Sequence, residues 1–122
     1  MAWVVLFDDQ FAKEMETLEE SVRLAIFKHA RALELEGPKL SRPFADTLNG
    51  SKHTNMKELR PTVKKVEWRV AFAFDPQRQA VLLVADAKGG ESDARFYKRL
   101  ISKADQRFDV HLTRLKEVKT KD

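Results

Sequence analysis

Two adjacent stretches decide the fold: Trp68-Arg69-Val70-Ala71-Phe72-Ala73-Phe74 and Ala80-Val81-Leu82-Leu83-Val84-Ala85. In the first stretch, large apolar residues alternate with small or charged ones, which predicts a strand. The second stretch is apolar throughout, which is typical of a buried central strand. The intervening Asp75-Pro76-Gln77-Arg78 has the composition of a turn. Together these segments predict an antiparallel hairpin at the centre of a sheet.

Shorter elements flank this hairpin. Residues 56–60 predict a short strand that ends at Pro61, and residues 3–7 predict a strand near the N-terminus. Steps of three and four between apolar residues predict helix from Phe11 to Leu33, in one piece or divided near residues 17–21.

The sequence also indicates where the N-terminal helical segment begins and ends, and it predicts a last helix. Asp8 or Asp9 can cap the first helix, and Gly37-Pro38 ends it. Residues 37–55 have the composition of a loop. A final helix carries Tyr97 on its apolar stripe, and residues 116–122 read as a frayed polar tail.

These elements predict one α+β domain over residues 1–122. Its parts are an N-terminal strand, a helical hairpin or long helix, a three-stranded antiparallel meander and a C-terminal helix. We expect the helices to cover one face of the sheet and the opposite face to be partly open.

The composition excludes several classes of protein. Cysteine is absent, so disulfide frameworks and thiolate zinc sites are excluded. His29, His53 and His111 are the only histidines and do not favour a histidine-rich metal centre, so we expect no metal and no cofactor. No apolar run approaches the ~20 residues that cross a bilayer. The first residues also lack the features of a signal peptide, so we expect a cytoplasmic protein without a membrane partner.

The net charge of +4 is unevenly distributed. Residues 37–70 carry eight basic and three acidic side chains, and residues 98–122 carry eight basic and four acidic ones. A basic surface attracts polyanions such as nucleic acid. The same composition also suits an ordinary solvated surface, so charge alone leaves both interpretations open.

No common catalytic motif is present: the sequence lacks a nucleophile elbow, a phosphate-binding loop and a zinc-protease motif. Lys, Arg, His, Glu and Tyr remain, and these residue types suit the cleavage of RNA by its own 2′-hydroxyl. That reaction needs a proton acceptor, a proton donor and cations around the phosphate.

The segment Lys52-His53-Thr54-Asn55-Met56-Lys57-Glu58-Leu59-Arg60 offers such groups. Alternation places Glu58 and Arg60 on one face of the strand, with Lys57 and Leu59 on the other. Arg69 lies opposite Trp68 on the next strand, so we expect it to join Arg60 on the open face. A surface strand with an ordinary salt bridge from Glu58 is the competing interpretation.

Further candidates have structural alternatives. Lys88, beside Gly89-Gly90, could contact a phosphate or simply be solvated. Tyr97 could stack on a base, donate a proton or pack in the core. His111 shares the stripe of Tyr97, and we expect it to be packed.

An ordered set of motifs over most of the chain, from about Phe7 to Leu112, resembles the phage-derived Gp49-like branch of the RelE/HigB toxin superfamily. The motifs are Gly37-Pro38, Leu40-Ser41-Arg42-Pro43, Asp46-Thr47-Leu48-Asn49-Gly50-Ser51, Met56-Lys57-Glu58-Leu59-Arg60, Trp68-Arg69-Val70-Ala71-Phe72-Ala73-Phe74-Asp75-Pro76, Lys88-Gly89 and Phe96-Tyr97. The resemblance implies a RelE-like fold. It also implies a type II toxin that cleaves messenger RNA on the ribosome and pairs with a helix-turn-helix antitoxin.

The resemblance also implies roles for residues. Arg60 and Arg69 match the strand arginines that the family directs at the substrate, Lys88 matches a basic position after the last strand, and Tyr97 loosely matches an aromatic residue near the C-terminus.

From these matches we expect a metal-independent endoribonuclease. Arg60, Arg69 and Lys88 would neutralise the phosphate, and His53 or Glu58 would take the 2′-hydroxyl proton. Tyr97 or Lys57 would assist the leaving group, and Lys52 and Lys57 would add RNA contacts.

Two alternatives stay open. A toxin of this fold could act on a protein target such as DNA gyrase, or the chain could be a non-catalytic member of a DNA-binding complex. Under the favoured interpretation, operator DNA is bound only through the antitoxin.

Overall fold

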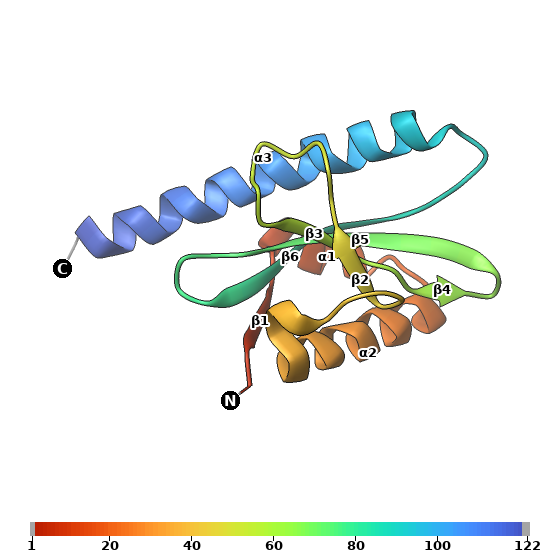
Figure 1. The fold of residues 1–122 in the computed structure, drawn as a ribbon, viewed down its shortest axis with the longest axis horizontal. Helices are drawn as coiled ribbons and strands as arrows, with labels where there is room; N and C mark the ends of the chain where they lie inside the picture. Colours follow the sequence, from red (N-terminus) through yellow and green to blue (C-terminus); the bar gives the residue numbers. More distant parts are fainter. Residues whose placement is uncertain (1, 121–122) are drawn as a thin grey trace.

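The computed structural model describes residues 2–120, and its centre is a twisted sheet with the strand order β1-β6-β5-β3-β2 (Figure 1). The strands are β1 (Val4–Phe7), β2 (Ala45–Thr47), β3 (Met56–Leu59), β5 (Val66–Phe74) and β6 (Gln79–Ala87). β3, β5 and β6 form the antiparallel meander that the sequence predicts, and β1 pairs in parallel with β6. The apolar strand β6 is therefore an interior strand of the sheet, flanked by β1 and β5, in agreement with the predicted burial.

Two short strands were not predicted from the sequence. β2 lies in the segment expected to be a loop and pairs with β3, while β4 (Thr62–Val63) forms a tight hairpin with the start of β5. With three and two residues, these strands are too short to show alternation.

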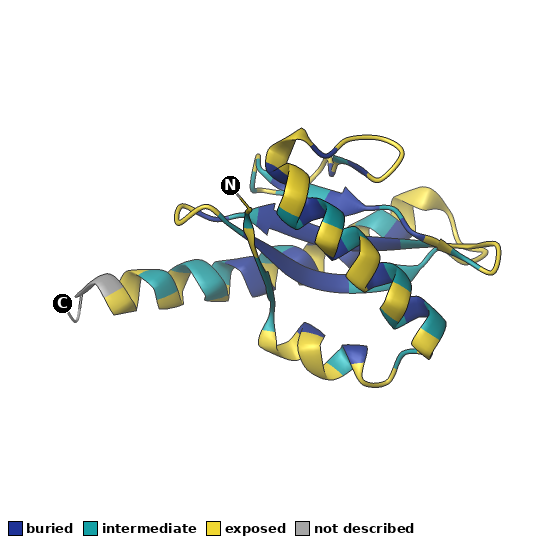
Figure 2. Cartoon of the chain, turned by 90° about the horizontal axis from the view of Figure 1, so that it is seen from below, coloured by how far each residue is buried: buried dark blue, intermediate teal, exposed yellow. Residues whose placement is uncertain are grey.

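Helices cover both faces of the sheet, so the expectation of a partly open face is wrong (Figures 1 and 2). α1 (Asp9–Met15) and α2 (Glu20–Glu36) pack on one face, and α3 (Asp93–Thr120) packs on the other. From the sequence, the small residues Ala71 and Ala73 were expected to lie on the open face of the sheet. In the structure they make room for the large side chains of α3, such as Phe96, Leu100 and Phe108.

A β-bulge adapts β6 to these two cores. The pairing steps from Ala71 opposite Val84 to Phe72 opposite Leu82, so Leu83 is an extra residue in β6. Leu83 and Val84 consequently both belong to the core beneath α3, although they are consecutive.

The N-terminal helices begin and end at the predicted signals. The Asp8 carboxylate caps α1 by accepting hydrogen bonds from the backbone N–H groups of Gln10 (3.0 Å) and Phe11 (3.1 Å). The helical segment is divided, with α2 starting at Glu20. Gly37 ends α2 with a φ of 57°, and a Cβ there would collide with the indole ring of Trp3.

α3 is longer than expected and extends past the sheet (Figure 1). Residues 116–120, expected to be a frayed tail, continue the helix, because neither glycine nor proline interrupts this run. Residues 121–122 lie outside the described part of the chain. None of the helices within residues 2–120 is long and apolar enough to span a bilayer.

Asp75 joins the β5–β6 turn to α3. Its carboxylate accepts hydrogen bonds from the backbone N–H groups of Gln77 (2.9 Å) and Gln79 (3.0 Å), and it lies 2.7 Å from Nε2 of His111. Burial raises the pKa of Asp75, but the contacts with His111 and Gln79 outweigh burial and hold the pKa below its usual range. His111 is thus a packed structural residue, as expected.

Replacing Asp75 with asparagine should cost roughly 1–3 kcal/mol of stability near neutral pH and less in acid. A depressed carboxyl pKa contributes stability above the unfolded value of about 3.9, and this contribution is lost as the pH falls through the folded value. Urea unfolding of both proteins, from neutral pH downward, should therefore give converging stabilities. A stability difference that stays constant into acid would contradict this account.

Candidate functional site

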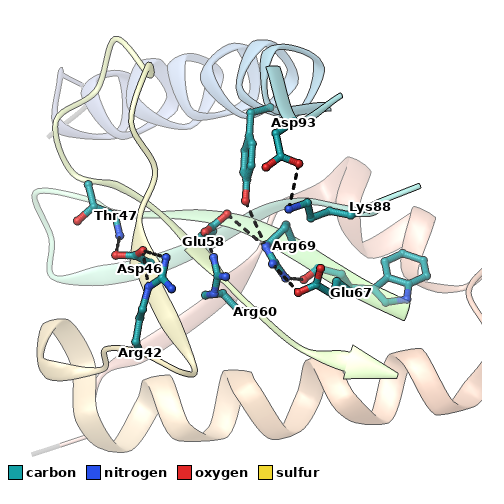
Figure 3. A network of polar contacts seen from close by, with 11 residues as sticks. Arg42, Asp46, Thr47, Glu58, Arg60, Glu67, Arg69, Lys88 and Asp93 are labelled. Carbon is teal, nitrogen blue, oxygen red and sulfur yellow. Dashed lines mark hydrogen bonds and ion pairs between the residues drawn. The ribbon is translucent and has the colours of Figure 1, made fainter. Parts of the chain in front are cut away.

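A polar groove of about 320 Å³ lies where β2, β3 and the start of α3 meet. Glu58 lies on β3, Arg60 follows β3, and Lys88 follows β6 (Figure 3). Tyr97 lies on the first turns of α3. The groove is lined by Arg42, Asp46, Thr47, Leu48, Asn49, Glu58, Arg60, Lys88, Asp93 and Tyr97. The structure therefore brings several of the predicted site residues to one place.

Glu58 is a buried carboxylate at the wall of this groove, with only 3% of its surface exposed. Its Oε2 accepts a hydrogen bond from Nη1 of Arg60 at 2.5 Å. Its Oε1 lies 3.8 Å from Nε of Arg69 and has no hydrogen-bond partner within residues 2–120. Glu58 is thus held between two guanidinium groups with one oxygen unpaired (Figure 3).

Arg69 lies beneath Tyr97 and is 2% exposed. It donates hydrogen bonds from Nε to the Tyr97 hydroxyl (3.2 Å), from Nη1 to the carbonyl of Trp68 (2.9 Å) and from Nη2 to Oε1 of Glu67 (3.2 Å). Burial lowers the pKa of Arg69, but the hydrogen bonds to Tyr97 and Glu67 outweigh it, so the pKa is raised.

The expected exposure of Arg69 on an open face is therefore wrong. Alternation correctly places Arg69 opposite Trp68, but α3 covers that face of the sheet.

Cations line the accessible part of the groove. Lys88 lies 3.2 Å from Asp93 and 5.6 Å from the centre of the Tyr97 ring, a cation–π arrangement. Arg42, which the sequence did not single out, donates from Nε to Asp46 at 2.9 Å. This hydrogen bond from Arg42 is the main reason why the pKa of the Asp46 carboxyl lies below its usual range. Two sequence signals pointed to Arg42: its place in the basic segment 37–70 and its place in the motif Leu40-Ser41-Arg42-Pro43.

A second hollow of about 310 Å³ continues the groove toward the β4–β5 hairpin. It is lined by Arg42, Pro43, Arg60, Thr62, Glu67 and Arg69. Because Arg42 and Arg60 line both hollows, the two hollows form one connected polar surface, in which the cationic side chains are paired with carboxylates.

Three predicted residues lie elsewhere. Nε2 of His53 is 2.9 Å from Asp109 on α3, and Lys52 forms an ion pair with the same carboxylate. Asp109 follows Tyr97 by twelve residues of α3, or roughly 18 Å at 1.5 Å per residue. These contacts anchor the loop before β3 to α3. Lys57 points away from the groove, on the side of β3 opposite Glu58.

The groove offers positioned donors and a carboxylate, without an evident metal centre. Arg60 and Lys88 can donate to an anion, the Tyr97 hydroxyl can donate or accept, and Glu58 can accept a proton. In the described part of the chain, no three His, Asp or Glu side chains gather as potential metal ligands. The arrangement suits phosphate binding with proton transfer.

Residues 13–109 match the family described as phage-derived Gp49-like proteins, a range that includes every residue of the groove. The chain belongs to the Gp49-like family. This Gp49-like chain is 44% identical over 97 residues to a Mycobacterium tuberculosis protein named as a candidate toxin, HigB2, covering 79% of this chain and 48% of that protein. It is 51% identical over 75 residues to a second protein so named, HigB3, covering 62% and 63%.

The matches thus span less than two thirds of either relative. Among solved structures, the Gp49-like chain resembles a free-state mutant of the Escherichia coli toxin RelE with two arginines replaced by alanine. The TM-score is 0.58 at 18% identity, over 88% of this chain and 98% of that chain, which shows the shared fold. Family, relatives and fold together confirm the RelE/HigB superfamily.

Proposed function

We propose that the protein is the toxin of a type II toxin–antitoxin pair and cleaves messenger RNA on the ribosome without a metal ion. The observation that supports this most is the groove itself. It combines Arg60 and Lys88 with the buried Glu58–Arg69–Tyr97 cluster in a chain related to HigB-named proteins. A phosphate-cleaving site needs this combination of cations and proton-transfer groups.

The geometry supports different roles for the groups of the site in the proposed reaction. A phosphate entering the groove draws Arg60 toward it, which releases Oε2 of Glu58 to accept the proton of the 2′-hydroxyl. The 2′ oxygen then attacks phosphorus and forms a cyclic phosphate, and the bond to the 5′ oxygen breaks. Glu58 suits the role of base better than His53, which lies outside the groove.

The remaining groups serve the leaving oxygen and the developing charge. Because the Tyr97 hydroxyl accepts a hydrogen bond from Arg69, its own proton can be donated to the departing 5′ oxygen. Arg60 and Lys88 supply positive charge around the phosphate, and buried Arg69 holds Tyr97 and Glu58 in place.

The partners follow from the same proposal. A type II toxin is controlled by an antitoxin, which we propose to be a helix-turn-helix protein that alone binds the operator DNA. The basic residues around the groove would attract an acidic segment of that antitoxin. The complex and its ribosomal target would lie in the cytoplasm.

Primer extension on messenger RNA after brief induction tests this proposal. We expect growth arrest and cuts at codon spacing, and the Glu58→Gln variant at equal expression provides the control. Gyrase-dependent DNA breaks without RNA cuts would contradict the proposal and favour a protein target. Unimpaired growth with soluble protein and no cuts would favour a non-catalytic member of a DNA-binding complex.

A further inference from the structure

The β4–β5 hairpin has an unusual turn. Val63 pairs with Val66, so Lys64 and Lys65 form a two-residue connection, with φ values of 50° and 69°. Positive φ at both positions is the geometry of a type I′ turn, for which Asn-Gly is strongly preferred. A lysine side chain is strained in this region because its Cβ crowds the backbone. Two consecutive lysines there oppose the local conformational preference.

The other hairpin shows how such strain can be offset within the fold. Arg78 also has a positive φ, 62°, in the turn between β5 and β6. Its backbone N–H donates to the carbonyl of Asp75, and its guanidinium lies 5.0 Å from the centre of the Trp3 ring. Arg78 therefore has a structural role that explains its type.

Lys64 and Lys65 have no comparable role. Lys64 approaches Glu19 at 3.7 Å, but both side chains are 74% exposed, and such pairs contribute little. Lys65 is exposed and has no side-chain partner within residues 2–120. Among the described residues, no contact of Lys64 or Lys65 compensates for the strained backbone, which indicates a requirement for their charge.

The position of the hairpin suggests what that charge binds. Thr62 and Glu67, the second pair below the tip, line the second hollow together with Arg42 and Arg60. At about 3.3 Å per residue, the lysines lie roughly 7–10 Å beyond that hollow. Arg42 and Arg60 line the hollow next to this hairpin, and Lys64 and Lys65 extend the set of cations to its tip. The hairpin itself projects from the sheet at β4 (Figure 1). An extended polyanion lying in the groove would reach them.

We propose that Lys64 and Lys65 form a second RNA contact, which holds backbone phosphates of the strand that continues out of the groove. This inference rests on the proposed function, because it takes the occupant of the groove to be RNA. The tip does not touch the reacting atoms, so it contributes to binding and not to the chemical step.

Two variants separate charge from backbone strain. K64N/K65G installs the preferred turn and should raise Tm by roughly 4 °C while removing both charges. K64Q/K65Q removes the same charges but keeps the strain. K103Q/K116Q, on exposed positions of α3, removes the same net charge far along the chain from the hairpin.

Binding is measured by fluorescence anisotropy with a labelled, fully 2′-O-methylated single strand, which cannot be cleaved. Each phosphate contact contributes about 0.7 to the slope of log affinity against log salt, so both tip variants should lose about 1.4 of that slope. The affinity of both should fall several-fold at low salt, and K103Q/K116Q should match the wild type.

Unchanged RNA affinity and salt slope in the tip variants would overturn the proposal, as would an equal loss in K103Q/K116Q. A tip variant that binds RNA normally but loses the antitoxin would also overturn it and make the hairpin a protein contact. Because the probe is not cleaved, these outcomes are independent of the primer-extension test. Wild-type protein that cuts messenger RNA while the tip variants bind normally would refute only this inference.

Discussion

Replacing Arg69 with alanine is expected to lower the free energy of unfolding by about 3 kcal/mol, near the lower end for breaking a buried charged pair. The variant would lose hydrogen bonds to Tyr97, Trp68 and Glu67 and leave a cavity beneath α3. It would also remove one of the two guanidinium groups beside the buried carboxylate of Glu58. The remaining contact with Arg60 keeps the loss from being larger.

Urea and thermal unfolding measure this effect, and Tm should fall by roughly 10 °C. Arg42→Ala is a matched control, because the side chain of Arg42 is 68% exposed and its loss should cost about 0.5 kcal/mol or less. The double variant Glu58→Leu/Arg69→Met removes both charges and should recover part of the stability. Normal melting of Arg69→Ala would show that this arginine is not buried as described.

Replacing Arg60 with alanine is expected to reduce cleavage by about 10²–10³-fold, the usual effect of losing one donor to transition-state charge. The side chain of Arg60 is 18% exposed at the groove, where water can replace it beside Glu58. Stability should therefore fall by only about 1–2 kcal/mol. Arg60→Lys should restore part of the rate, because lysine keeps the charge but lacks the planar two-pronged donor.

Cleavage by each variant is followed by primer extension at matched protein level, with melting measured on the same preparations. A rate loss much larger than the loss of folded protein places Arg60 in the chemistry. Full cleavage by a normally folded Arg60→Ala protein would place the active site outside the groove.

The fold could be predicted largely from local patterns. Alternation in residues 68–74 and the apolar run in 80–85 are strong signals, because each residue's face follows from a period of two. The same pattern could not show that α3 covers the alanine side of β5. That contact depends on how Ala71 and Ala73 fit Phe108 and its neighbours, which is tertiary packing.

The candidate site was predictable to the extent that it is built on regular strands. Glu58 and Arg69 lie on the side of the sheet that alternation gives them, and Arg60 follows directly after β3. Loop residues were not predictable in this way. His53 contacts Asp109, which lies 56 positions later in the chain. A local sequence pattern cannot predict a contact between residues so far apart.

The pairing of β1 with β6 determines when the sheet can form during synthesis. Val4 of β1 pairs with Gln79 of β6, so the first strand has no neighbour in the sheet until most of the chain has been synthesised. Such distant pairing favours late, cooperative folding over growth from the N-terminus. Tyr97, supplied by α3, is added later still. A nascent chain therefore carries no assembled groove until α3, the last helix, has emerged from the ribosome.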